Sequence, residues 1–532
     1  MTAASEQQPA ASVATPAVPP RLFRNVWLPA AATCAALYLA TMAPGVLWGD
    51  SGDTQYRVLT ERLWGINQIA RAHATYFAVA VAGCRAFGLE PAFAGNLVAA
   101  LAGAVTVANF ACLVALFVRR RSALISGTCL LMLSHTLWQL STGAEVVTFS
   151  TMCLSFELLA LRLFVRTGRL PWLALTALGN SLGWSTHNMA LLTWPAYGVC
   201  AFRGWRRIPR PRGRSLGVAA AAWAVGFVPL AVMIGREYGQ VGDAGTVLRS
   251  LLVGFYGDQV FNVAVGPASF ARLAAFAGLN FPTPLILLAV WGWWSLRSGG
   301  GRGTWWFLTV STAVFVAFGG RYNVPDQYTF MVHAYVFLVL FAAIGIDHWL
   351  DRHPSRAMHA ATVALALAGP VVYALAPPLI SRYAPDALPR PGREIPYRPS
   401  ISWFLTPWRT AYDGAERYAR EVLDALPPDA VLLIDSTARQ PLDYLQLHER
   451  LRPDVSIPRG IQRHKADRPP EITPQEAAAL IARGRLFCAT TVPAYLPPWL
   501  AEGGFRFEQV GHVYRVLFPD DGSTPPQPGG GG

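Results

Sequence analysis

The stretch FAGNLVAALAGAVTVANFACLVALFVRRR, residues 93–121, indicates the kind of fold that this chain adopts. Its apolar part, Phe93–Val118, contains no charged side chain, and about 20 such residues in a helix cross the roughly 30 Å hydrocarbon core of a bilayer. Arg119, Arg120 and Arg121 follow at once, and arginine clusters beside apolar helices are typical of cytoplasmic loops. The stretch therefore predicts a membrane-spanning helix that ends at the cytoplasmic face.

Comparable apolar stretches recur from Val26 to Leu375, and most are separated by short arginine clusters. Of the 532 residues, 53% are hydrophobic and only 14% are charged, against roughly 25% charged residues in soluble domains. The net charge of +13 would suit a nucleic-acid partner, but the basic residues are divided among the clusters and form no single patch. The composition predicts a polytopic membrane protein and argues against nucleic acid as a partner.

The first arginines set the expected orientation. With Arg21 and Arg24 on the cytoplasmic side, the first span, about Val26–Ala43, delivers the next residues to the outer face. If each later apolar stretch crosses the membrane in the direction opposite to the one before it, the sequence predicts about 11 spans up to Leu375. The stretch Thr75–Phe87 is short and suits a half-inserted helix on the outer side. We expect a bacterial-type plasma membrane, with the N-terminus in the cytoplasm and the C-terminal region outside.

Composition divides the chain into four parts. Residues 1–20 and 519–532 are rich in Pro, Ala, Gly and Ser and are expected to be disordered tails. Residues 21–378 form the apolar membrane domain. Residues 379–518 alternate strand-like and helix-like segments, such as the buried strand expected at Ala430–Asp435, which suits a soluble α/β domain. The predicted fold class is an all-α membrane bundle followed by a small soluble, extracytoplasmic α/β domain.

Several ionisable side chains converge on the outer face, although this threading depends only on the arginines and the apolar stretches. They are Asp50, Asp53, His73, Glu145, His187 and Asp326. Ionisable residues gathered beside an apolar bundle are typical of functional sites in membrane proteins. The alternative is that outer loops are polar wherever they occur. We expect a site at the outer membrane surface.

The loop WGDSGD, Trp48–Asp53, carries two carboxylates, and Gly49 and Gly52 permit a tight turn or a close backbone approach. A carboxylate at an apolar boundary has its pKa raised by desolvation, which suits a general base that takes a proton from a hydroxyl. The alternative is that Asp50 or Asp53 caps the N-terminus of an interfacial helix.

The other outer residues suit substrate binding. His73 could orient an acceptor or contact a phosphate, or it could be a structural histidine at the headgroup boundary. A buried Glu145 needs a partner, such as His187 or an arginine. Arg321, in a short outer loop, could bind a lipid phosphate, or it could extend toward lipid headgroups in general. The ionisable residues show no metal-site spacing, so we assign no metal ligands, and the sequence leaves a metal requirement open.

These residues and their order along the chain resemble the GT-C superfamily of membrane glycosyltransferases, which use polyprenyl-phosphate sugars as donors. Within it, the chain looks like the family that includes the animal O-mannosyltransferase of plexin-type receptors and many bacterial members. The resemblance covers Val26 to about Pro458 and rests on WGDSGD from Trp48, NLVAAL from Asn96, GAEVVTF from Gly143, GWSTHN from Gly183 and YNVPDQY from Tyr322.

The resemblance implies a catalytic base in the first outer loop, at Asp50 or Asp53. Because the family commonly has Glu where this chain has Asp53, Asp50 is favoured. The resemblance also implies that Arg321 contacts the donor phosphate. The residues expected to bind substrate are His73, Glu145, His187, Asn188, Arg321, Tyr322 and Asp326.

The expected activity is an inverting transfer of a sugar, mannose-like or unknown, from a polyprenyl phosphate to a hydroxyl group on a protein or glycan acceptor. The expected partners are therefore the lipid-linked sugar, this acceptor and membrane lipid, with no cofactor besides the donor. Two other classes of protein remain open. One is a transporter or flippase, which would have ionisable residues near the bilayer midplane and often repeated halves. The other is a scaffold without catalytic activity in envelope assembly.

Overall fold

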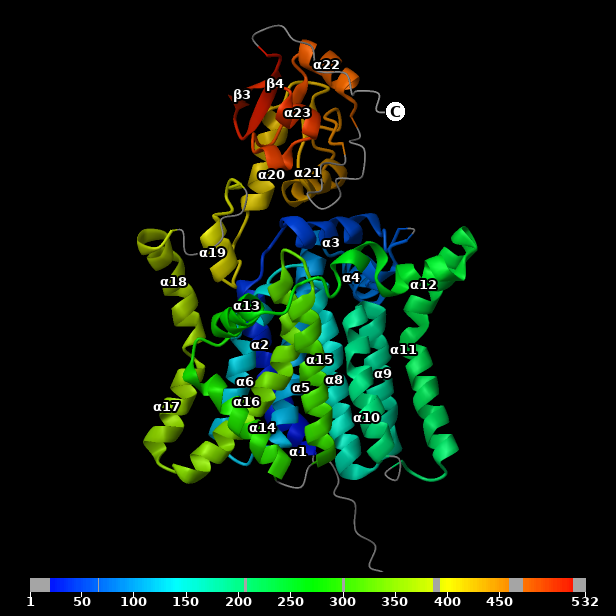
Figure 1. Ribbon diagram of the computed structural model, residues 1–532, viewed down its shortest axis with the longest axis vertical. Helices are drawn as coiled ribbons and strands as arrows, with labels where there is room; N and C mark the ends of the chain where they lie inside the picture. Colours follow the sequence, from blue (N-terminus) through cyan, green and yellow to red (C-terminus); the bar gives the residue numbers. More distant parts are fainter. Residues whose placement is uncertain are drawn as a thin grey trace, which may run out of the picture.

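The computed structural model of the chain describes residues 20–65, 67–204, 208–298, 302–385, 393–458 and 472–519. It consists of a tall bundle of helices with a smaller α/β domain at one end, and a layer of short helices lies between the two (Figure 1). The two predicted tails lie outside the described residues, apart from Pro20, which begins the first helix, and Pro519.

Five helical segments in the described part of the chain are long and apolar enough to cross a membrane. They are α5 (Pro91–Ala115), α8 (Val146–Thr167), α11 (Arg212–Val241), α15 (Arg302–Arg321) and the run formed by η7 (Gln327–Met331) and α16 (Val332–Arg352). A sixth candidate is the pair α17 (Arg356–Ala366) and α18 (Gly369–Tyr383), which is bent by 47°. The larger expected number, about 11 spans, stays a prediction.

Shorter helices complete the bundle. They are α1 (Pro20–Leu22), η1 (Phe23–Trp27), α2 (Leu28–Thr41), α6 (Arg121–Met132), α7 (His135–Leu140), α9 (Leu170–Thr186), η3 (Asn188–Thr193), α10 (Trp194–Gly204), η6 (Pro284–Leu287) and α14 (Leu288–Ser298). Several adjoin a 3-10 segment, as η3 adjoins α10 and η6 adjoins α14. Because of such breaks, an apolar stretch in the sequence does not always become one long helix.

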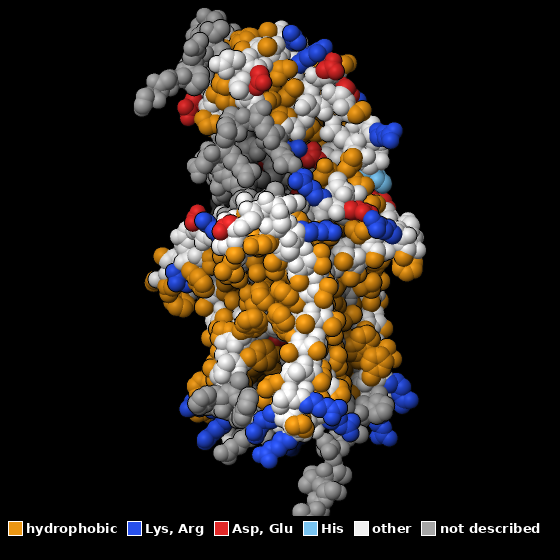
Figure 2. Space-filling view, turned by 90° about the vertical axis from the view of Figure 1, so that its right-hand side faces the viewer, with side chains coloured by type: hydrophobic (Ala, Val, Ile, Leu, Met, Phe, Trp, Pro, Cys, Tyr) orange, Lys and Arg blue, Asp and Glu red, His pale blue; other side chains and the backbone are white. Residues whose placement is uncertain are grey.

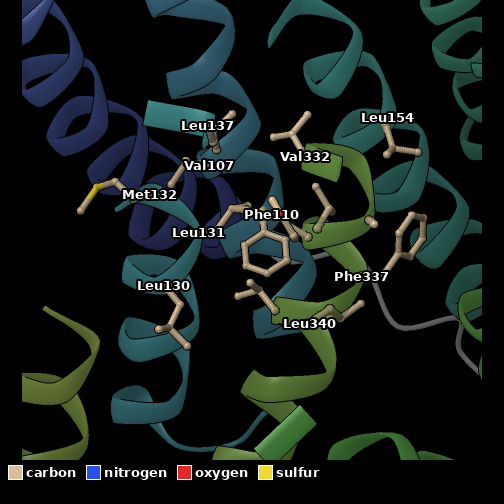
Figure 3. Close-up of a cluster of buried hydrophobic side chains, with 14 of the residues drawn as sticks. Val107, Phe110, Leu130, Leu131, Met132, Leu137, Leu154, Val332, Phe337 and Leu340 are labelled. Carbon is tan, nitrogen blue, oxygen red and sulfur yellow. The ribbon is translucent and has the colours of Figure 1, made fainter. Parts of the chain in front are cut away.

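The centre of the bundle is packed closely. A Cβ atom at Gly292 of α14 would overlap the backbone of Phe341, so only glycine lets α14 and α16 approach this far. Phe110 of α5, Leu131 of α6 and Phe337 of α16 are fully buried in the same core (Figure 3). These contacts hold the central helices in a fixed arrangement.

The outside of the bundle has the surface expected of a membrane protein. Figure 2 shows a broad hydrophobic band on the face in view, with arginine side chains gathered at the end away from the α/β domain. The apolar window of α11 is only 17% buried, so this helix presents most of its side chains to the outside. The arginine-rich end is the one that the positive-inside rule predicts to be cytoplasmic.

A layer of short helices covers the opposite end of the bundle (Figure 1). It contains α3 (Gly49–Thr60), η2 (Ile69–Arg71), α4 (Ala74–Phe87), α12 (Ala244–Leu252), η5 (Gly254–Gln259) and α13 (Pro267–Asn280). The expected half-inserted helix Thr75–Phe87 corresponds to α4. The prediction of a loop at WGDSGD is wrong, because Gly49–Asp53 forms the start of helix α3.

The α/β domain has a four-stranded sheet of order β1-β2-β4-β3. Its strands are β1 (Val431–Leu433), β2 (Leu486–Cys488), β3 (Arg506–Val510) and β4 (Val513–Leu517). β1 and β2 are parallel, and the other neighbouring strands are antiparallel. Its helices are α19 (Ser400–Leu405), α20 (Gly414–Ala425), α21 (Ser436–His448), α22 (Pro474–Ala482), η8 (Pro493–Tyr495) and α23 (Pro498–Glu502). α21 packs against α3, which joins this domain to the layer below it.

Candidate functional site

Helix α3 places the two aspartates predicted from the sequence, and the α/β domain fixes where this helix begins. Trp48 is buried, and its indole N–H donates a hydrogen bond to the Tyr412 hydroxyl at 2.6 Å. Gly49 has a φ of +57°, a left-handed conformation that glycine adopts without strain. The N-cap residue is Trp48, and its side chain makes no capping bond. The structure therefore does not show Asp50 or Asp53 in the alternative role of N-cap.

Asp50 lies near two other carboxylates, Glu145 and Asp326, which come from distant parts of the sequence. The Ser51 hydroxyl donates to Glu145 Oε1 at 2.7 Å. Burial raises the pKa of Glu145 to about 8, with further contributions from the charges of Asp50 and Asp326. Burial also raises the pKa of Asp326, and the charge of Asp50 raises it further. We call Asp50, Asp53, Glu145 and Asp326 the acidic group.

Asp50 is the exposed member of the acidic group. Enough protein surrounds it that desolvation still raises its pKa; the positive charge of Arg71 opposes this shift, and the negative charge of Asp53 adds to it. A carboxylate that is accessible, partly desolvated and close to a cation can take up a proton from a bound hydroxyl group.

Arg71 is the cation that the structure brings to the acidic group. Its guanidinium pairs with Asp53 at 3.4 Å, and both side chains are about one third exposed. Burial alone would lower the pKa of Arg71, but Tyr256, Asp53 and Asp50 outweigh this effect and raise it. The guanidinium therefore stays charged beside an accessible carboxylate, which is an arrangement that can bind a phosphate group.

His73 and His187 form a second group at the same face. Their rings stack with centroids 5.3 Å apart. His73 Nδ1 lies 2.7 Å from the Thr186 carbonyl oxygen, so Nδ1 carries the proton and Nε2 is left as an acceptor. Burial lowers the pKa of His187 to about 4 and the pKa of His73 well below its usual range. Both rings are therefore neutral at pH 7.

Two predicted site residues, Arg321 and Asn188, hold segments together at the end of the bundle that carries the acidic group. Arg321 donates to the backbone carbonyls of Val263 and Phe261, at 3.2 and 2.6 Å. Asn188 donates to the Leu251 carbonyl at 2.7 Å, which fastens α12 to η3. These bonds account for the conformations of Arg321 and Asn188 without any ligand.

Tyr322 packs on Phe330, with ring centroids 4.7 Å apart. It also lies 6.4 Å from Tyr256 of η5, and its pKa is raised by burial and by the charges of Tyr256 and Asp326. Tyr322 therefore belongs beside the acidic group.

Sequence reasoning did not identify Arg71, Ser51 or Tyr256 as candidates. The sequence contained no signal that singles out Arg71, because Arg57, Arg62 and Arg85 fall in the same predicted outer segment. Ser51 and Tyr256 have no such signal either. Among the described residues, no three His, Cys, Asp or Glu side chains are arranged to hold a metal ion.

No protein-family model matches this sequence, and no curated protein matches it either. Solved structures of similar fold do exist. ArnT from Cupriavidus metallidurans in the apo state matches with a TM-score of 0.55 and 13% identity over 93% of this chain and 98% of that chain. ArnT from Cupriavidus metallidurans bound to undecaprenyl phosphate matches with a TM-score of 0.54 and 13% identity, covering 94% and 98%.

The oligosaccharyltransferase of Archaeoglobus fulgidus in its apo form is also similar, with a TM-score of 0.52 and 12% identity over 94% of this chain and 76% of that chain. These neighbours are GT-C glycosyltransferases, and they are integral membrane proteins. At such low identity the likeness shows the fold. This chain is therefore a membrane protein with the GT-C fold.

Proposed function

We propose that this chain is a membrane glycosyltransferase that moves a sugar from a polyprenyl phosphate to an acceptor hydroxyl. The observation that carries the proposal is Asp50, an accessible carboxylate of raised pKa beside Arg71, located where the bundle meets the α/β domain. The GT-C fold supports it, since one similar structure is described as bound to undecaprenyl phosphate.

In the proposed reaction, the Asp50 carboxylate takes the proton of the acceptor hydroxyl as its oxygen attacks the anomeric carbon of the donor sugar. A new carbon–oxygen bond forms while the bond to the phosphate breaks and its electron pair leaves with the phosphate. Attack from the face opposite the phosphate inverts the anomeric centre. Glu145 keeps its proton at neutral pH because its pKa is about 8, whereas Arg71 favours the ionised form of Asp50.

An arginine is expected to stabilise the departing phosphate. The family resemblance suggests Arg321, whose guanidinium contacts two backbone carbonyls. Arg71 is the stronger candidate because it is electrostatically coupled to Asp50 and pairs with Asp53. In this scheme Asp53 is a positioning residue that holds Arg71, and His73, His187, Asn188, Tyr322 and Asp326 shape the donor and acceptor pockets.

The choice of sugar and acceptor rests on the narrower sequence resemblance. The plexin-type O-mannosyltransferase family makes a mannose-like sugar on a polyprenyl phosphate the first donor to test. A hydroxyl of a protein or glycan is the corresponding acceptor. We propose that transfer takes place at the outer face of a bacterial plasma membrane.

The test is sugar transfer by purified protein supplied with a polyprenyl-phosphate sugar. Asp50→Asn keeps the size of the side chain but cannot accept the proton, so we expect kcat to fall by about 10²–10⁴-fold. Asp53→Asn is expected to have a smaller effect. Glu61→Gln is the matched control, because Glu61 ends α3 on the surface and pairs with Arg85.

Transfer by Asp50→Asn at the rate of the unchanged protein would refute the role of the base. If the unchanged protein moved the lipid across the membrane but transferred no sugar from any donor, it would be a flippase. If it did neither, the scaffold class would be favoured.

A further inference from the structure

A large cavity in the described part of the chain lies away from the acidic group. It occupies about 1250 Å³, which exceeds the roughly 300–1,000 Å³ of ordinary small-molecule pockets. Its walls come from the ends of α5, α8 and α14 and from the start of α15, in the half of the bundle away from the α/β domain (Figure 1). This is the end where the arginine side chains gather (Figure 2).

Arg162 lines this cavity from within the spanning helix α8. Its guanidinium stacks on Phe117 at 4.0 Å and donates to the Leu116 carbonyl at 3.3 Å. Its Nε atom is buried and has no partner among the described residues, and no described carboxylate pairs with it. An arginine inside a membrane segment is costly unless its charge is paired or faces water. Because Arg162 faces the cavity and its only hydrogen bond in the described structure goes to a neutral carbonyl, its guanidinium is placed to bind an anionic ligand there.

Other groups on the cavity wall suit the same ligand. Arg297 and Arg302 add two positive charges, and no acidic residue lines the cavity in the described part of the chain. The Trp305 side chain is 8% exposed, and its indole N–H has no partner in the described structure. The rest of the wall is mainly leucine, phenylalanine and tryptophan. A single occupant thus meets cations, an indole donor and a long apolar surface.

We propose that this cavity binds one anionic phospholipid from the leaflet on the arginine-rich side of the membrane. Its phosphate lies between Arg162, Arg297 and Arg302, and an acyl chain extends along the apolar wall. Basic pockets between spanning helices on the cytoplasmic side commonly bind acidic headgroups in this way. The lipid site is separate from the acidic group and does not depend on glycosyl transfer.

Native mass spectrometry of the purified full chain tests the proposal, with phosphatidylglycerol or phosphatidylcholine added in measured amounts. We expect one phosphatidylglycerol per chain, held at least about tenfold more tightly than phosphatidylcholine. Arg162→Gln should weaken phosphatidylglycerol binding by about tenfold or more, since it removes a charged hydrogen-bond donor. Arg162→Lys keeps the charge and should retain most of the binding.

Arg166→Gln is the matched control, because Arg166 lies one turn further along α8, is exposed and does not line the cavity. If Arg162→Gln folds poorly, the double variant Arg297→Gln with Arg302→Gln tests the same site from α14 and α15. Equal binding of the two phospholipids, or equal binding by Arg162→Gln and Arg166→Gln, would overturn the proposal. Displacement of phosphatidylglycerol by an equimolar polyprenyl phosphate would also overturn it, since the lipid carrier would then be the occupant.

Discussion

The carboxylates near Asp50 have different partners: one accepts a hydrogen bond and another forms an ion pair. Ser51 donates a hydrogen bond to Glu145, and Arg71 forms an ion pair with Asp53. Burial and neighbouring negative charge raise the pKa of Glu145 to about 8. At neutral pH Glu145 therefore keeps a proton that a free glutamic acid would have lost. This difference makes the stability of the folded protein depend on pH.

Glu145 makes the protein less stable as the pH rises. The unfolded chain loses the Glu145 proton near pH 4.5, whereas the folded chain keeps it up to about pH 8. The folded state thus binds more protons between these values, and stability falls with increasing pH across that window. Glu145→Gln should flatten this dependence, measured as the apparent unfolding midpoint in detergent from about pH 5 to about pH 8. Glu502→Gln, at the exposed last residue of α23, should leave the slope unchanged. An unchanged slope in Glu145→Gln would contradict the prediction.

The two candidate arginines for the donor phosphate can be separated by substitution. Arg71→Gln removes the cation coupled to Asp50 and should lower kcat by about 10²–10³-fold. Arg321→Gln removes bonds to the backbone of Val263 and Phe261, so it should lower the unfolding midpoint more than kcat. Steady-state kinetics and thermal unfolding of both variants distinguish the roles. A larger loss of kcat in Arg321→Gln would restore Arg321 as the phosphate ligand.

Among the elements, α3 links the site to the α/β domain. A Cβ atom added to Gly52 would lie 2.5 Å from the Leu47 carbonyl oxygen and 2.6 Å from Gln440 Cβ of α21. Such distances are shorter than van der Waals contact, so the glycine is needed for the close approach of the two helices. The position of Asp50 therefore depends on how α21 packs.

Gly52→Ala should push α3 away from α21. Overpacking of this kind costs roughly 1–3 kcal/mol of stability, and misplacing a catalytic group by about 1 Å can cost on the order of 100-fold in rate. We expect a lower unfolding midpoint together with slower transfer. Gly235→Ala on α11 is the control, since a Cβ atom there meets no atom within 4 Å. A Gly52→Ala protein as active and as stable as the control would show that α21 does not position α3.

At the scale of the whole molecule, the α/β domain is attached to the bundle at several points. The Tyr412 hydroxyl accepts from Trp48, and the Tyr444 hydroxyl accepts from the Ala92 backbone N–H at 3.0 Å. These contacts put the domain directly over α3 (Figure 1). The domain and the acidic group therefore lie at the same end of the bundle, and the arginine-rich end lies on the other side of the hydrophobic band.

Reporter fusions test the predicted orientation. Alkaline phosphatase joined after Pro385 should be active, because the positive-inside rule puts this end outside the cytoplasm. A fluorescent protein that matures only in the cytoplasm should be bright when joined after Arg352, at the end of α16. As controls, alkaline phosphatase joined after Arg352 should be inactive, and the fluorescent protein joined after Pro385 should not fluoresce. The reverse pattern would put the acidic group in the cytoplasm and would exclude an extracytoplasmic acceptor.

The sequence by itself determined that this is a helical membrane protein with a small α/β domain. It could do so because the apolar stretches, the arginine clusters and the alternation after residue 379 are patterns of neighbouring residues. It also predicted that Asp50, Glu145 and Asp326 converge on one membrane face, and the structure brings these three carboxylates near one another. It did not predict the breaks that shorten several helices, such as η6 before α14, although Pro282 and Pro284 are local helix-breaking signals at that point.

Only the tertiary structure decided which side chains meet. Ser51 and Glu145 are 94 positions apart in the chain, so no local pattern predicts their hydrogen bond. The same holds for the helical start of WGDSGD, which packs against α21, and for Arg321, which donates to the backbone carbonyls of Val263 and Phe261. Apolar stretches and the distribution of arginines indicate whether a segment lies in the membrane or in water. The direction of a polar side chain depends instead on partners that only the folded chain brings within hydrogen-bonding distance.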